Sequence, residues 1–279
     1  MNINDQFSKA NDLYSPIEVK ARYAICSTPR SGSHYFGHLL KEAGDFGYPL
    51  EYFHNEHIEI WTKRKNQSSY TNILDFLESI RTSKSGIFGT KLHFTHLKNL
   101  KEHIEIKSFL SSYKLIFITR RDTLSQAVSY SRALQTGSWI SGMPEKQTPV
   151  YNRDHIMQRL QHIIRCNASW ELLSSLYNIN IHRVVYEDIL NNEQATVESF
   201  ASFISENNSD FYTSNLTKMP KKQSDNLNKE WKNRFLNEVW EADFNINEID
   251  ILKKHQAFQQ PQENFIDKLK TLCSHKPTS

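Results

Sequence analysis

The fold is decided by one stretch near the N-terminus, Tyr23-Ala24-Ile25-Cys26-Ser27-Thr28-Pro29-Arg30-Ser31-Gly32-Ser33-His34. A short apolar run ends here in a polar turn that holds a cation, hydroxyl groups and a glycine, and a helical pattern follows. Backbone N–H groups at a helix N-terminus favour a phosphate or sulfate, and Gly32 lets the backbone approach it closely. The stretch therefore predicts a loop that holds the 5′-phosphate end of a nucleotide. The alternative is an ordinary strand-to-helix turn whose Arg30 faces water.

A second polar segment also begins where a predicted strand ends. The apolar run 114–119 leads directly into Arg120, and Ser125 and Ser129 follow on one face of a helix because they are four residues apart. A strand-end arginine with helix hydroxyls indicates a second anion site. A capped, salt-bridged surface helix is the alternative. Two anion sites on one sheet would suit a nucleotide with phosphates at both ends.

Strands alternate with helices along most of the chain. We expect strands at 22–27, 86–92, 114–119 and 181–186, and helices at about 31–43, 73–81, 97–110, 123–136, 152–177, 193–204 and 229–239. This alternation predicts an α/β fold with a mainly parallel sheet, in which ligands bind at the carboxyl ends of the strands. Glycine, serine and proline in 137–150 predict a mobile loop there, a candidate lid.

Composition narrows the class of protein. The chain has 279 residues, 38% of them hydrophobic, and a net charge of +3, which predicts one domain over residues 1–279. The absence of a Lys/Arg block argues against nucleic-acid binding, and the mild positive charge favours a small anionic ligand. The sequence has no apolar run of about 18 residues and no apolar N-terminal segment. We therefore expect a cytoplasmic protein with at most peripheral membrane contact.

The cysteines do not indicate a disulfide framework or a zinc site. Cys26, Cys166 and Cys273 are far apart and form no Cys-x-x-Cys pair. Cys26 lies in the predicted first strand and is expected to be a small core residue. No metal is predicted.

The loop from Ser27 to His34 also differs from a Walker A motif. That motif requires Gly-x-x-x-x-Gly-Lys-Ser/Thr, and this loop has no such lysine. Ordinary ATP hydrolysis is therefore disfavoured. Arg30 can still form bidentate hydrogen bonds to phosphate or sulfonate oxygens.

Four motifs together carry a resemblance. They are Ser-Thr-Pro-Arg-Ser-Gly-Ser, Gly-x-Pro-x-Glu-Tyr-Phe, Phe-Gly-Thr-Lys-Leu and Ile-x-Arg-Arg-Asp-x-x-x-Gln-Ala-Val-Ser. In this combination, over about residues 22–240, the chain resembles the sulfotransferases that use 3′-phosphoadenosine 5′-phosphosulfate (PAPS). More narrowly, it resembles the Stf0-type, trehalose 2-sulfotransferase-like bacterial branch. The resemblance implies a P-loop-like three-layer α/β fold, a homodimer, and metal-free transfer of a sulfuryl group to a hydroxyl, with adenosine 3′,5′-bisphosphate (PAP) as the product.

The resemblance also implies roles for individual residues in donor binding. The 5′-phosphosulfate would be held by Arg30, Ser31, Gly32 and Ser33, and the 3′-phosphate by Arg120 and Ser129 with Ser125 and Arg121 as neighbours. Tyr186 would lie near the adenosine, and a late loop containing Lys221, Lys222, Gln223 and Ser224 would close over the donor. The branch often has threonine at the position of His34.

Glu51 matches the glutamate proposed as the catalytic base of this branch. A carboxylate can take the proton of an acceptor hydroxyl, an effect worth about 10²–10⁴-fold. Arg30 and Lys91 would stabilise charge on the transferring group and on the leaving phosphate. The alternative for Glu51 is an exposed carboxylate in a turn. Three histidines compete for the role of base: His34, His54 and His93.

The expected function is sulfuryl transfer from PAPS to a hydroxyl of a sugar, glycolipid or other acceptor. A P-loop-type kinase and a nucleotide-binding protein without sulfotransferase activity are the alternatives. Two tryptophans have open assignments. Trp170 could stack on adenine or belong to the core, and Trp139 in the loop 137–150 could pack against a sugar ring.

Overall fold

The computed structural model describes residues 7–13, 18–65, 70–140, 143–204 and 226–241. The chain divides into two compact units, residues 1–232 and 233–279. The second is described only over 233–241, which is the last part of helix α10 (Asn226–Glu241). The single domain expected over residues 1–279 therefore stays a prediction.

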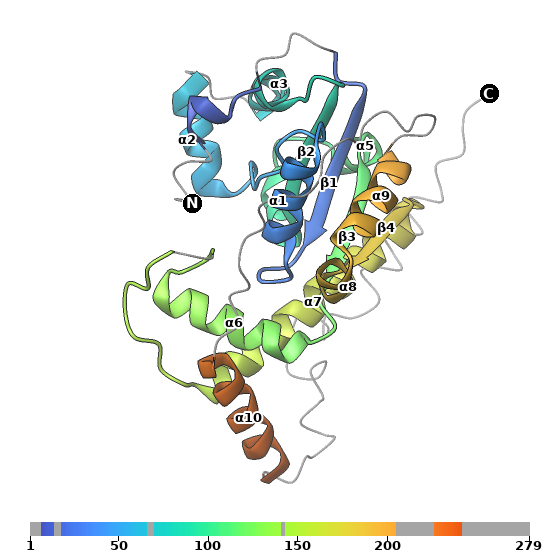
Figure 1. Cartoon of the computed structure of the whole chain (residues 1–279). Helices are drawn as coiled ribbons and strands as arrows, with labels where there is room; N and C mark the ends of the chain where they lie inside the picture. Colours follow the sequence, from blue (N-terminus) through green and yellow to red (C-terminus); the bar gives the residue numbers. More distant parts are fainter. Residues whose placement is uncertain (1–6, 14–17, 66–69, 141–142, 205–225, 242–279) are drawn as a thin grey trace, which may run out of the picture. The chain divides into compact units, whose positions relative to one another are not determined.

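The first unit is built on a parallel sheet of four strands (Figure 1). They are β1 (Ala21–Ser27), β2 (Ile87–His93), β3 (Lys114–Thr119) and β4 (Ile181–Val185), in the order β2-β1-β3-β4. Every pairing is parallel, with Ser27 opposite His93 and Cys26 opposite Phe117. The carboxyl ends of the strands therefore meet at one edge, as the sequence predicts.

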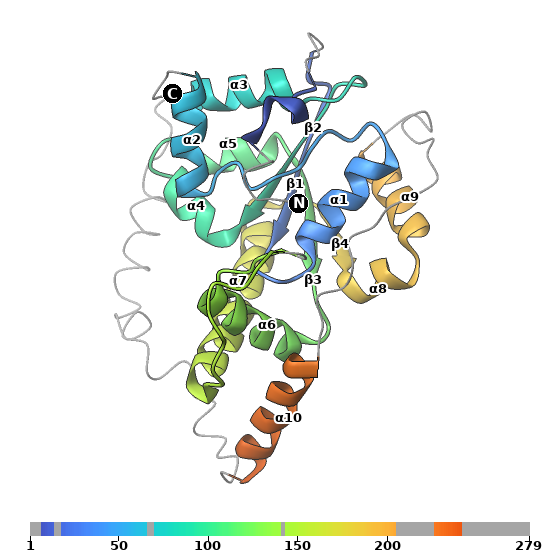
Figure 2. The same cartoon turned by 60° about the vertical axis from the view of Figure 1, so that its left-hand side comes forward.

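Helices connect the strands and cover both faces of the sheet (Figure 2). They are α1 (Ser33–Ala43), α2 (Asn55–Lys65), α3 (Tyr70–Arg81), α4 (Phe94–Leu100), α5 (Ile106–Ser111), α6 (Thr123–Thr136), α7 (Arg153–Tyr177), α8 (Tyr186–Asn191) and α9 (Glu193–Ile204). A short 3₁₀ helix, η2 (Lys9–Asn11), precedes β1.

Alternation along β1 produces two hydrophobic cores. Tyr23 and Ile25 point to one face, where α1, α8 and α9 pack, and Ala24 and Cys26 point to the other, where α2 to α5 and Trp170 of α7 pack. All four side chains are fully buried, as expected of a central parallel strand. This arrangement confirms the predicted α/β fold with helices on both sides of a mainly parallel sheet. Burial raises the pKa of the Cys26 thiol, which is a core group as predicted.

Two local expectations are wrong. The helix predicted at 97–110 is two helices, α4 and α5, because the Glu105 side chain accepts the N–H groups of Lys107 and Ser108 and begins a new helix there. Tyr186, expected at the end of a strand, is instead the first residue of α8, a helix that was not predicted. The acidic residues Glu187 and Asp188 in its first turn favour a helix N-terminus at this point.

The segment before β1 is attached to α2 and α3 by a buried ion pair. Asp12, whose side chain is 1% exposed, contacts the guanidinium groups of Arg64 and Arg81, the latter at 3.2 Å. Arg81 also donates to the carbonyl of Asn11 at 2.9 Å. A buried charge pair is costly to break because the remaining charge stays in a medium of low dielectric constant.

Replacing Asp12 by alanine should therefore destabilise the protein strongly. We expect Asp12→Ala to lower the free energy of unfolding in urea by about 3–5 kcal/mol, because it removes the counter-ion of a buried arginine. The matched control is Glu171→Ala, since Glu171 pairs at 2.6 Å with Arg183 but both side chains are about half exposed. That variant should change the free energy by at most about 1 kcal/mol. Equal losses in the two variants would contradict the role of burial.

Candidate functional site

The loop between β1 and α1 has an unusual backbone. Arg30 has a φ of 65° and Gly32 a φ of 93°, both in the left-handed region. Gly32 is also the N-cap of α1 and has no side chain with which to cap it. The ring of Tyr186 lies so close to Gly32 that a Cβ at this position would collide with it. The loop thus needs glycine here, and the first N–H groups of α1 are available to an anionic ligand.

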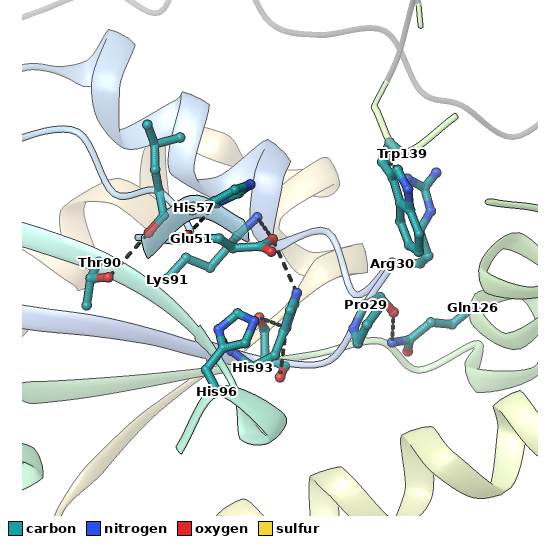
Figure 3. A network of polar contacts seen from close by, with 12 residues as sticks. Pro29, Arg30, Glu51, His57, Thr90, Lys91, His93, His96, Gln126 and Trp139 are labelled. Atoms are coloured by element: carbon teal, nitrogen blue, oxygen red, sulfur yellow. Dashed lines mark hydrogen bonds and ion pairs between the residues drawn. The ribbon is translucent and has the colours of Figure 1, made fainter. Parts of the chain in front are cut away.

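Gln126 of α6 holds this loop in place. Its Nε2 donates to Thr28 Oγ1 and to the carbonyl of Pro29, each at 2.8 Å, and Figure 3 shows it reaching Pro29. Gln126 is fully buried. Sequence reasoning assigned it no role, although it is the glutamine of the fourth motif, Gln-Ala-Val-Ser. A long polar side chain among apolar helix positions was the available signal.

Arg30 joins the two predicted anion sites. Its Nε donates to Ser129 Oγ at 2.9 Å, and its Nη1 donates to the carbonyl of Trp139. Burial and the positive charges of Arg120 and Arg132 lower the pKa of Arg30 to about 10. Cations gather here at an energetic cost, which a bound anion would offset.

Arg120 and Ser31 provide donors that take no part in the hydrogen bonds of Arg30 with Ser129 and Trp139. Arg120 Nε and Ser31 Oγ are buried and have no hydrogen-bond partner among the described residues. The Arg120 guanidinium lies 5.3 Å from the ring centroid of Tyr186, and its Nε is 3.7 Å from Glu187 Oε1. Buried polar groups normally have partners, so these atoms are suited to the oxygens of an anionic ligand. The residues at the loop therefore fit a nucleotide with phosphate or sulfonate groups.

Ser125 and Arg121 are engaged elsewhere. The Ser125 hydroxyl and N–H both donate to Asp122, at 2.6 and 3.0 Å, which caps α6. Burial opposes ionisation of Asp122, but Lys232 and Ser125 outweigh it and lower its pKa to about 2. Arg121 is exposed and pairs with Asp188 at 2.6 Å. The structure thus joins Arg30 with Ser129 and places Arg120 on Tyr186, whereas Ser125 and Arg121 bind neighbouring carboxylates.

The predicted base Glu51 lies against β2. Leu50 forms a parallel bridge with Thr90, and its carbonyl accepts the N–H of Lys91 at 2.8 Å. This places Glu51 Oε1 at 2.6 Å from Lys91 Nζ and 3.2 Å from His93 Nε2. Figure 3 shows both side chains converging on the carboxylate. Two residues predicted separately for the reaction, Glu51 and Lys91, are thus an ion pair.

The neighbours of Glu51 decide its protonation. Burial favours the neutral acid, but the charge of Lys91 and the contact with His93 outweigh burial and hold the pKa of Glu51 well below its usual range. Glu51 is therefore an ionised carboxylate and can accept a proton. It becomes a stronger base wherever the contact with Lys91 weakens.

Of the three histidines that compete for the role of base, His93 contacts the carboxylate of Glu51, whereas the described contact of His54 with Glu51 is from its backbone N–H to the Glu51 carbonyl, at 3.3 Å. His34 Nε2 lies 3.1 Å from Nε2 of His38, and burial and the charge of Lys91 lower the pKa of His34 to about 2, so its ring is neutral. His54 packs its ring against those of His57 and His96. Sequence reasoning missed His57, whose Nδ1 is 2.6 Å from the carbonyl of Glu51.

Trp170 and Trp139, the two tryptophans with open assignments, lie in different environments. Trp170 is fully buried, packs on Phe94 and donates its indole N–H to the carbonyl of Ser27 at 3.3 Å. It is therefore a core residue and does not stack on a base. Trp139 is partly exposed and offers its carbonyl to Arg30. Described residues of the predicted loop 137–150 form hydrogen bonds to α6. For instance, the side-chain amide of Gln135 donates to the carbonyl of Val150 and accepts the N–H of Val150.

Some expectations fall on parts that are not described. Lys222 and Gln223, with Lys221 and Ser224, lie outside the described residues, as does Cys273. Among the residues that are described, no group of three or more His, Cys, Asp or Glu is arranged to hold a metal ion. No helix in the described part of the chain is long and apolar enough to cross a membrane.

Comparisons with known proteins agree with the motifs. One solved structure, a sulfotransferase domain from the olefin synthase of Synechococcus PCC 7002, is similar over 68% of this chain and 75% of that one, with 13% identity and a TM-score of 0.37. No curated protein matches. The model of the Stf0 sulphotransferase family matches residues 22–238, which is most of the chain. The chain therefore belongs to the Stf0 sulfotransferase family and is a sulfotransferase.

Proposed function

We propose that the protein transfers a sulfuryl group from PAPS to a hydroxyl of a carbohydrate or glycolipid and releases PAP. The observation that carries the donor assignment is the set of buried donors around Arg30. Ser31 Oγ and Arg120 Nε have no hydrogen-bond partner among the described residues, and Arg30 bears a charge that its cationic neighbours disfavour. A nucleotide with anionic groups at both ends would satisfy these groups. The acceptor class rests on the resemblance.

The binding residues divide between the two ends of the donor. In this proposal Arg30, Gly32 and the first N–H groups of α1 hold the 5′-phosphosulfate, together with the hydroxyls of Ser31 and Ser33. Arg120 and Ser129 hold the 3′-phosphate, with Ser125 beside them, and Tyr186 lies near the adenosine. The contact between Arg120 and Tyr186 supports this division, since one cation can face a phosphate and an aromatic ring together. The resemblance adds Lys222 and Gln223, which lie outside the described residues, to the proposed donor site.

The proposed reaction needs positioning, charge stabilisation and one proton acceptor. Glu51 takes the proton of the acceptor hydroxyl, and the oxygen of that hydroxyl forms the new bond to sulfur. The bond between sulfur and the bridging oxygen of the 5′-phosphate breaks, and PAP leaves with the bridging oxygen. Arg30 and Lys91 stabilise the negative charge that moves onto the leaving phosphate. This scheme requires no metal ion. Homodimerisation and a cytoplasmic location stay predictions.

Nucleotide binding tests the donor assignment. Because the site offers donors for two anionic ends, we expect isothermal titration calorimetry to show binding of PAP and at least 10-fold weaker binding of ATP. The P-loop-type kinase predicts the reverse order. Binding of ATP alone would overturn the proposal.

The 3′-phosphate assignment can be tested within one motif. Arg120→Ala removes a charged hydrogen-bond donor worth about 1.5–3 kcal/mol, so it should weaken PAP binding by roughly 10- to 100-fold. AMP, which lacks the 3′-phosphate, should lose little. Arg121→Ala is the matched control because Arg121 is exposed and pairs with Asp188. Equal losses for PAP and AMP would count against the assignment.

The role of Glu51 can be tested once a screen of acceptor sugars with labelled PAPS identifies a substrate. Glu51→Gln keeps the shape of the side chain and removes its basicity, so turnover should fall by about 10²–10⁴-fold while PAP still binds. Glu59→Gln, at an exposed position of α2, is the control and should retain full turnover. Full activity of Glu51→Gln would show that another group accepts the proton.

A further inference from the structure

Strand β2 presents two cationic or proton-donating groups to the same carboxylate. Lys91 and His93 are two residues apart and therefore point to the same side of the strand. Lys91 Nζ lies 2.6 Å and His93 Nε2 3.2 Å from the same oxygen, Glu51 Oε1. These two contacts are not equivalent, because the side chains that make them differ in freedom. Lys91 is a flexible chain with a single terminal charge, whereas His93 is a rigid ring.

The ring of His93 is held at its second nitrogen as well. His93 Nδ1 lies 3.1 Å from Ser27 Oγ and 3.2 Å from the carbonyl of Ser27. Ser27 is fully buried, ends β1 and is the register partner of His93. The backbone N–H of His93 donates to His96 Nδ1 at 3.2 Å. The ring is thus fixed between the strand end that begins the anion loop and the carboxylate of Glu51 (Figure 3).

These partners fix where the ring carries its protons. A carboxylate only accepts, so the contact with Glu51 requires a proton on Nε2. Ser27 offers Nδ1 a hydroxyl, which can donate or accept, and a carbonyl, which only accepts. Nδ1 therefore has a partner whether the ring is neutral or charged. The Nε2–H bond to Glu51 survives in both states.

Lys91 cannot pair with Glu51 and stabilise charge on the leaving phosphate at the same time. While Lys91 contacts Glu51, it weakens the carboxylate as a base, and the carboxylate balances the positive charge of Lys91. The charge of Lys91 also helps to lower the pKa of His34 in the first turn of α1, so Lys91 lies near the start of that helix as well as at the carboxylate. If Lys91 turns toward charge that develops on the leaving phosphate, Glu51 loses its closest partner. His93 then remains as the contact that holds the carboxylate in position.

We propose that His93 is the positioning residue of the base. Its Nε2–H holds Glu51, and Ser27 anchors the other side of the ring. Lys91 is thereby left free to move between Glu51 and the donor. This inference rests on the proposed function, because it takes Glu51 as the acceptor of the hydroxyl proton.

The first test is spectroscopic and needs neither donor nor acceptor. In the full-length protein labelled with ¹⁵N-histidine, long-range ¹H–¹⁵N correlation spectra distinguish the ring tautomers, and His93→Gln identifies the signal of His93. We expect a proton on Nε2 of His93 at every pH at which the protein is folded. A neutral ring with its proton on Nδ1 would overturn the proposal, since it would turn a lone pair toward Glu51.

The second test compares two amides at position 93. The nitrogen of glutamine can reach the place of Nε2 and donate to Glu51, whereas the shorter asparagine reaches only the place of Nδ1. His93→Asn should lower kcat by up to ~10²-fold, the effect of a misplaced catalytic group, and His93→Gln by less than 10-fold. KM for PAPS and the binding of PAP should stay within 2-fold in both, because the ring contacts that carry this proposal are with Glu51 and Ser27, which are not among the residues proposed to bind the donor.

A merely structural role gives a different pattern. Equal losses of kcat in His93→Asn and His93→Gln, with parallel losses in thermal stability, would overturn the proposal. Failure of the proposed function would look different again. The wild-type protein would then not turn over PAPS, while the tautomer of His93 would still show whether the ring holds Glu51.

Discussion

The parallel pairing of β1 with both β2 and β3 is the constraint on which the site depends. Pairing in this register brings Ser27 beside His93 and ends all of the strands at one edge. A parallel strand can only be reached by a long crossover, so each strand end leads into a new loop and helix at that edge. The anion loop follows β1, Arg120 follows β3, and Lys91 and His93 lie in the last three positions of β2. Residues far apart in the chain thus meet at one place.

Several cationic side chains lie at this edge, and some of them have a carboxylate partner, such as Lys91 with Glu51 and Arg120 with Glu187. Arg30 is partly buried beside Arg120 and Arg132, and burial and these positive charges lower its pKa. Such an arrangement reduces the stability of the ligand-free protein and makes the binding of an anion more favourable. The left-handed backbone of Arg30 is a further cost at the same loop. The protein holds it by hydrogen bonds from Gln126, which was not recognised in the sequence.

Glu51, Lys91 and His93 form a second cluster of charged and polar groups at the same edge of the sheet, at the carboxyl end of β2. The ion pair of Glu51 with Lys91 satisfies two groups that would each be expensive to bury alone, but it also makes each less effective in a reaction. A network of this kind is suited to a change of partners when a ligand brings new charge. In the proposed reaction the flexible lysine moves, and the ring fixed by Ser27 does not.

The sequence by itself determined the order of strands and helices, the parallel α/β class and the motifs of the family. Periodicity and turn residues are local, and the apolar runs that form β1 and β3 could be read without knowing their neighbours. It also predicted roles for Arg30, Arg120 and Glu51, because their motifs are contiguous. It erred at Glu105 and Tyr186, where a side-chain cap and acidic residues in a first turn decide the helix boundaries.

Only the tertiary structure decided which of these residues touch. Glu51 could have been a lone carboxylate in a turn, and Lys91 and His93 lie about forty residues later in the chain. They meet Glu51 because the bridge between Leu50 and Thr90 aligns two segments side by side, a pairing that no local pattern encodes. The same holds for Arg30 and Ser129, and for Trp170, whose place in the core depends on α7 lying under the end of β1. Long-range packing, which sets distances and burial, assigned the partners and hence the charge of each group.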